Sequence, residues 1–188
     1  MAGAQERVLR RRIGSVGNTK KITRAMELIS ATRVTKAQQR AREARPYATE
    51  ITKVIQDLSA QGTSVDHPLL RQNEDPKVVG VVVLASDRGL AGAYNASVIR
   101  AAEREVQAAR SEGREYRLVC IGKKSSSYFR FRGYTIDAEF EGISDTPVYS
   151  NAREVAGKVA AMFLSEGVER IMLAYTEFVS LGTQKPRV

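Results

Sequence analysis

The sequence has little of what metal centres, disulfide frameworks and membrane spans require: it contains one cysteine, one histidine and no tryptophan in 188 residues. Because Cys120 is alone, the chain cannot form an internal disulfide or a multi-cysteine metal cluster. No window approaches 18 consecutive apolar residues, and no apolar run of a secretory signal follows the arginine-rich start. We expect a protein of a reducing, cytoplasmic setting that holds no metal and does not insert into a membrane.

The positive charge is concentrated at one end of the chain. The formal net charge is +9, and residues 1–60 carry 13 Lys and Arg against 5 Asp and Glu, whereas the other 128 residues carry 17 against 16. A field concentrated on one element selects acidic partners at that element. Charge alone leaves nucleic acid, anionic lipid and an acidic protein open as that partner.

Residues 4–60 are rich in strong helix formers and contain one proline, which predicts a very long amino-terminal helix. At about 100° per residue, its apolar side chains occupy about one third of the circumference and form a continuous stripe. The stripe comprises Ile22, Met26, Ile29, Ala37, Ala44, Tyr47, Ile51, Val54, Ile55 and Leu58. The expected packing seam consists of Ile22, Ile29, Ala37, Ala44, Ile51, Val54 and Leu58.

The stripe is longer than the rest of the chain can cover. Apolar positions after Pro46 stay in phase with those before it, so we expect one helix over residues 1–61 with a kink near Pro46. Such a helix is about 80 Å long, whereas a domain of about 110 residues has a radius of gyration of about 13 Å. We therefore expect the stripe to be buried against something outside the chain.

The pattern changes after the helix. Residues 62–77 include Pro68 and Pro76 among polar residues and are expected to form a linker. From residue 78 onward, strands alternate with helices, which predicts an α/β fold with a mainly parallel sheet over residues 78–188. The expected strands are residues 78–85, 116–122, 134–140 and 170–175, and the expected helices are residues 95–112, 125–131 and 151–165. No amphipathic helix follows the last strand, so we expect a fragment whose carboxy-terminal helix is absent.

Two stretches carry a resemblance to a known family. The segment Arg11 to Ala31, RRIGSVGNTKKITRAMELISA, resembles the amino-terminal helix of the gamma subunit of F-type ATP synthases, and Ser86 to Asn95, SDRGLAGAYN, resembles the turn after that family's first strand. Shorter segments match in the same order, so the resemblance covers essentially the whole chain. The sequence departs from the family in lacking its carboxy-terminal third and any cysteine pair, and Ala91 stands where cysteine is common.

The resemblance implies a bacterial central-stalk rotor subunit, which transmits torque between the proton-driven membrane ring and the catalytic alpha and beta subunits. It implies that the long helix is half of an antiparallel coiled coil and that residues 78–188 form a Rossmann-like domain. The implied partners are the alpha, beta and epsilon subunits and the membrane c-ring, with no nucleic acid and no cofactor. The implied location is peripheral, at the cytoplasmic face of the bacterial plasma membrane. The residues implied to contact an acidic segment of the beta subunit are Lys20, Lys21, Arg24, Met26, Arg33 and Lys36.

Signals for catalysis are weak. The run Gly89 to Gly92 lacks the third glycine of a dinucleotide fingerprint, and the loop at residues 121–125 has Arg117 where a Walker A loop needs its first glycine. One histidine and one cysteine far apart suggest no nucleophile and base pair. We therefore expect a coupling protein without catalytic residues.

Two other classes remain as alternatives. The first is a nucleic-acid-binding protein whose basic helix follows phosphates, although on DNA the apolar stripe would stay unburied. The second is a small nucleotide-dependent α/β enzyme. The cations of the long helix could also form an ordinary solvated face.

Overall fold

The computed structural model describes residues 2–60, 67–71 and 73–188, with side chains described over 3–57, 67–71 and 73–188. Its internal contacts divide the chain into two units, Met1–Val65 and Asp66–Val188. Within the described residues, the first unit is a single long helix and the second is an α/β domain.

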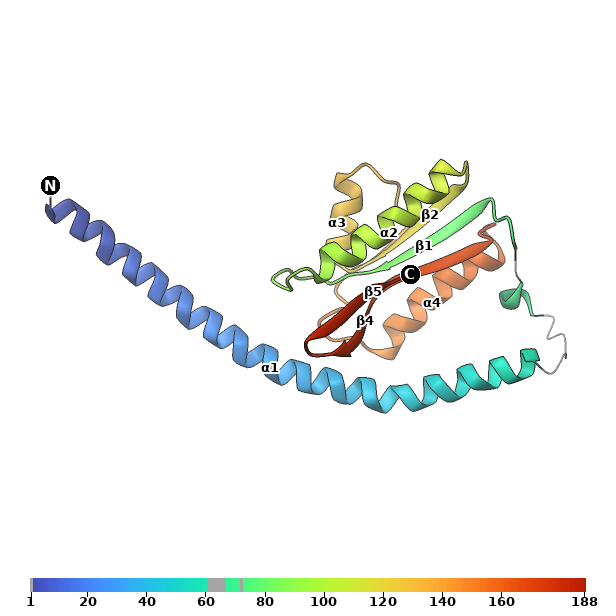
Figure 1. Ribbon diagram of the computed structural model, residues 1–188, viewed down its shortest axis with the longest axis horizontal. Helices are drawn as coiled ribbons and strands as arrows, with labels where there is room; N and C mark the ends of the chain where they lie inside the picture. The colour runs from blue at the N-terminus through green and yellow to red at the C-terminus, as the bar shows by residue number, and fades with distance from the viewer. Residues whose placement is uncertain (1, 61–66, 72) are drawn as a thin grey trace. The chain divides into compact units, whose positions relative to one another are not determined.

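The helix α1 (Ala2–Ala60) runs without a break (Figure 1). Pro46 lies inside it. Proline lacks the N–H that would bond to the carbonyl one turn earlier, but the strong helix formers on both sides continue the helix. The seam side chains from Ile22 to Val54 are exposed, with 61% of Ile22 and 53% of Ile29 accessible. The side chain of Leu58, the last predicted seam residue, lies outside the described residues. An exposed apolar stripe of this length indicates a surface that packs against a partner.

The α/β domain is built on one five-stranded sheet. Its strands are β1 (Val78–Leu84), β2 (Glu115–Ile121), β3 (Ala138–Phe140), β4 (Arg170–Ser180) and β5 (Thr183–Arg187). The spatial order is β3-β2-β1-β4-β5; the first four strands are parallel and β5 pairs antiparallel with β4. In the central register, Val81 lies beside Leu118 and Met172. The predicted mainly parallel α/β fold is therefore confirmed.

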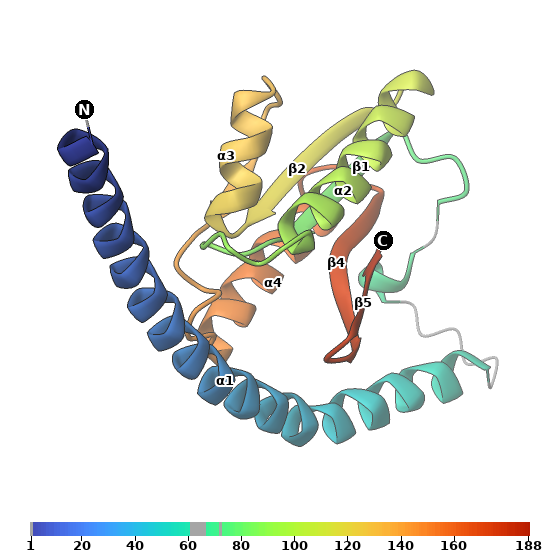
Figure 2. The same cartoon turned by 60° about the vertical axis from the view of Figure 1, so that its left-hand side comes forward.

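Helices cover both faces of the sheet. The helical elements of this domain are η1 (Pro68–Leu70), α2 (Tyr94–Ser111), α3 (Lys123–Phe131) and α4 (Tyr149–Leu164). The helices α2 and α3 lie on one face of the sheet and α4 lies on the other (Figure 2). Val81 and Leu118 pack with Phe129 in the core on the first face, and Val119 packs with Met162 in the core on the second. Alternate β1 residues thus enter different cores, which explains why the strand is apolar throughout.

Two strands differ from the expectation. The strand expected at residues 134–140 is shortened to Ala138–Phe140, because the Asp137 N–H donates to Leu118 O and the Asp137 carboxylate accepts from Leu118 N–H before regular pairing begins. The strand expected at residues 170–175 extends to Ser180 and returns as β5, which was not expected. This edge strand contains Pro186, which is tolerated there because its missing N–H costs no ladder bond at the edge of a sheet.

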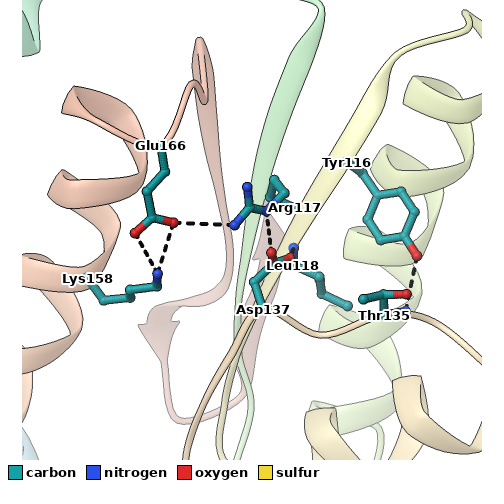
Figure 3. Close-up of polar contacts among 7 residues, drawn as sticks. All are labelled: Tyr116, Arg117, Leu118, Thr135, Asp137, Lys158 and Glu166. Carbon is teal, nitrogen blue, oxygen red and sulfur yellow. Dashed lines mark hydrogen bonds and ion pairs between the residues drawn. The ribbon is translucent and has the colours of Figure 1, made fainter.

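A chain of ion pairs ties α4 to the sheet (Figure 3). Arg117 on β2 bonds to Asp137 and lies 3.3 Å from Glu166, and Lys158 on α4 donates to Glu166 at 2.8 Å. These contacts join β2, the segment before β3 and the end of α4. Among the helices of the described segments, none is both long enough and apolar enough to cross a bilayer.

Candidate functional site

The predicted partner-binding residues lie on α1, and all six are exposed. The structure does not bring them to one face. With about 100° per residue, Lys20, Lys21 and Arg24 lie within about 100° of one another on the side opposite the seam. Met26, Arg33 and Lys36 instead fall within the angular sector of the seam itself. The six residues therefore form two sets, a basic patch and a seam-side set.

The basic patch, Lys20, Lys21 and Arg24, extends its charges into solvent. Arg24 Nη1 lies 2.7 Å from Glu27 Oε2 in an i, i+3 pair, and both side chains are more than 60% exposed. Within the described residues, Lys20 and Lys21 form no ion pair. Exposed pairs such as Arg24 with Glu27 contribute about 0–1 kcal/mol, so an acidic partner can replace Glu27 at little cost. The patch can attract a negative surface without fixing one geometry.

The second candidate is the turn between β1 and α2, which carries the second family-like segment. Asn95 closes this turn, because its Oδ1 accepts from Ser86 N at 2.9 Å and its Nδ2 donates to Arg88 O at 3.3 Å. Arg88 also forms an ion pair with Asp145 at 2.5 Å. At the tip, Leu90 is 91% exposed and has a φ of 61°, a left-handed conformation that is rare for a leucine.

Asp87, in the same turn, has a carboxylate that accepts four hydrogen bonds. Its oxygens accept from the backbone N–H groups of Lys123, Gly142 and Ser144 and from the Ser144 hydroxyl, at 2.7–3.0 Å. Partial burial by itself would raise the pKa of Asp87, but the hydrogen bonds from Ser144, Gly142 and Lys123 outweigh it and lower the pKa to about 2. The carboxylate is thus charged throughout the neutral range.

Asp87 changes the interpretation of the two weak phosphate-loop signals. The first two backbone N–H groups of α3 are already bonded, that of Lys123 to Asp87 and that of Lys124 to Ser86 O at 3.0 Å. At the start of α2, the N–H of Tyr94 donates to Ala91 O at 3.2 Å. The groups that would bind a phosphate at α3 are therefore bonded within the domain.

The one histidine and the one cysteine of the sequence both have structural surroundings. The Nδ1 atom of His67 accepts from Leu69 N–H at 3.2 Å at the start of η1. Cys120 lies fully buried in the core. Burial, followed by the nearby charge of Glu139, raises the pKa of the thiol to about 12, so it is not a reactive thiolate.

Sequence reasoning missed Asp87, Ser144 and Asn95 as the residues that organise the turn. A signal was present for Asp87, because a polar residue two positions after the strand expected at residues 78–85 lies near the edge where the other strand ends also meet. Nothing in the sequence pointed to Ser144, which is 57 positions away.

Comparison with known proteins gives the family. A family model described as ATP synthase matches residues 5–188. The chain is 46% identical over 190 residues to the ATP synthase gamma chain of Frankia casuarinae, covering 99% of this chain and 63% of the relative. It is 44% identical over 199 residues to the gamma chain of Saccharopolyspora erythraea, covering 98% and 64%. The chain thus spans a little under two thirds of the length of these relatives.

Among solved structures, the chain resembles one from the mitochondrial ATP synthase of Tetrahymena thermophila, described as central stalk/c-ring, with a TM-score of 0.69 and 22% identity over 88% of this chain and 70% of that one. At this identity the likeness supports the fold. The sequence match to the gamma chains, which covers nearly the whole chain, supports a family relationship with them. The chain belongs to the ATP synthase gamma chain family.

Proposed function

We propose that the chain is part of the central-stalk rotor of an F-type ATP synthase and transmits torque between the membrane ring and the catalytic alpha and beta subunits. The observation that carries this proposal is α1, one continuous helix of 59 residues whose apolar seam is exposed. A second long helix packed along the seam would form an antiparallel coiled coil. Such a seam gives a shaft stiffness through side-chain packing rather than through directional bonds.

The basic patch is the proposed contact with an acidic segment of the beta subunit. Lys20, Lys21 and Arg24 lie opposite the seam, so they remain accessible when the seam is covered. Several exposed cations hold an acidic surface without a single deep energy minimum, which suits a shaft that must turn. In this arrangement Met26, Arg33 and Lys36 lie nearer the partner helix, and Met26 fills a gap in the seam.

The other proposed partners are the alpha and epsilon subunits and the c-ring, with the chain peripheral to the cytoplasmic face of a bacterial plasma membrane. We also infer that the chain is not catalytic. This inference is supported by the turn after β1, where Asp87 and Ser86 accept from the α3 N–H groups that could hold a nucleotide phosphate.

The test reverses two charges of the basic patch in the complete gamma chain, assembled into the enzyme and reconstituted in vesicles. Lys21→Glu with Arg24→Glu should weaken the coupling of ATP hydrolysis to proton transport while the α/β domain stays folded. Lys53→Glu is the matched control, because this exposed cation lies on the same side of α1 but far along the helix. Equal coupling in the double variant and the control would count against the patch.

A further inference from the structure

The carboxylate of Asp87 lies in a cradle of donors that come from two separate segments. Oδ1 accepts from Lys123 N at 3.0 Å, at the start of α3, and from Gly142 N at 2.9 Å. Oδ2 accepts from Ser144 N at 2.9 Å and from Ser144 Oγ at 2.7 Å. The carboxylate itself comes from the turn after β1. Three loops that follow three different strands are thus joined at one group.

The position of the Asp87 carboxylate in the sheet, and the donors that surround it, are typical of a site that binds an oxyanion. Parallel α/β sheets bind anionic ligands beyond the carboxyl ends of their strands, and converging backbone N–H groups with a helix N-terminus favour negative charge. The backbone is also adapted to close approach. Gly122, the residue before α3, has a φ of 90°, and a Cβ there would overlap the Ala85 carbonyl group. Only glycine allows the two loops to meet beside the carboxylate.

We propose that Asp87 is a built-in anion: its side chain fills an oxyanion cradle at the carboxyl edge of the sheet, in the place of a ligand, and thereby locks three loops together. The cradle is formed by the chain whether or not the chain acts in a rotor, so the proposal does not rest on the proposed function. It predicts that removing the carboxylate leaves a site for a small oxyanion such as formate or inorganic phosphate.

The hydrogen bonds of Asp87 also restrain the turn between β1 and α2. The turn is fixed at one end by Asp87 and at the other by Asn95, and Arg88 between them pairs with Asp145, the residue after Ser144. A left-handed leucine is a strained conformation that persists only when its surroundings hold it. The Asp87 cradle and the Asn95 bonds supply that restraint for Leu90, so the exposed tip is a rigid projection.

The test is chemical rescue of Asp87→Ala in the 188-residue chain. Without an added anion, the backbone amides of Lys123, Gly142 and Ser144 should exchange with deuterium roughly tenfold faster or more than in the unsubstituted chain, a factor matching one lost charged hydrogen bond. Sodium formate or inorganic phosphate should slow the exchange of these three amides, while sodium chloride at equal ionic strength should not. Asp75→Ala is the control. It removes an exposed carboxylate that forms an ion pair with Lys77, and the exchange of the three amides should then show no anion effect.

Comparison of the anions shows which shape the cradle prefers, a planar carboxylate or a tetrahedral phosphate, and either rescue supports the proposal. Absence of rescue by both, with the variant folded, would overturn it. If Asp87→Ala does not fold, Ser144→Ala provides a second measurement, because it keeps the carboxylate and removes one donor. The carboxyl carbon of Asp87, followed by NMR against pH, should then titrate at a higher pH than in the unsubstituted chain. An unchanged titration would contradict the cradle.

Discussion

Gly122 lies so close to the carbonyl group of Ala85 that no side chain fits between the turn after β1 and the start of α3. The left-handed φ of Gly122 adds a second reason for glycine, because an L-residue is strained in that conformation. Two independent constraints therefore meet at one position, next to the hydrogen bond from Gly122 N to Phe140 O at 2.7 Å.

Gly122→Ala should destabilise the α/β domain by about 3 kcal/mol or more, as the sum of backbone strain and overpacking. Urea unfolding followed by the near-ultraviolet circular dichroism of the tyrosines measures this loss. Gly157→Ala is the matched control, because Gly157 is exposed within α4 and a Cβ there meets nothing within 4 Å. That substitution should stabilise the domain by about 0.5–1 kcal/mol. Similar losses in both variants would refute the steric explanation.

Acid should weaken the domain through Asp87. Because the pKa of Asp87 in the folded chain, about 2, is below the usual aspartate value of 3.8, this carboxylate stabilises the fold above about pH 4, and the contribution is lost as the pH falls toward 2. After allowance for solvent screening, the contribution is about 1–2 kcal/mol. We expect Asp87→Asn to be less stable than the unsubstituted chain at pH 6, with a difference that shrinks as the pH falls to 2. A difference independent of pH would mean that charge is not the cause.

Asp137→Ala should cost about 2 kcal/mol, because it leaves the Leu118 N–H without its acceptor and Arg117 without its nearest carboxylate. Glu166→Gln keeps the shape of a more exposed member of the same network and should cost clearly less. Measuring the free energies of unfolding of Asp137→Ala and Glu166→Gln tests this difference. If Glu166→Gln is the more damaging change, the stabilising contact is the link to α4 rather than the support of β2.

The exposed seam predicts self-association of the 188-residue chain. We expect sedimentation velocity at tens of micromolar protein to show dimers or larger species, paired through α1. Ile29→Glu with Ile51→Glu should shift the chain toward monomer, because each places a charge in the seam. Thr49→Glu adds one negative charge on the opposite side of the helix and should have little effect. A monomeric unsubstituted chain would contradict the proposed need for a packing partner.

Much of the architecture follows from local pattern. The composition of residues 4–60 predicted α1, because the segment is rich in helix formers and its apolar positions keep the same helical phase on both sides of its single proline. The apolar run at residues 78–85 predicted a strand, and the observed strand β1 (Val78–Leu84) is the central strand of the sheet. The helical phase that separates Lys21 from Lys36 was also available from sequence spacing, although the predicted contact set grouped them together.

The sequence by itself determined the long helix, its exposed apolar seam and the alternation of strands and helices, because each depends on residues a few positions apart whose spacing sets which face they share. Only the tertiary structure decided that Asp87 meets Ser144 and that β5 returns along β4. These contacts depend on how strand ends are brought together in space. No period in the sequence records which loop lies beside which, and the physical partner of a carboxylate is fixed only when the sheet order is fixed.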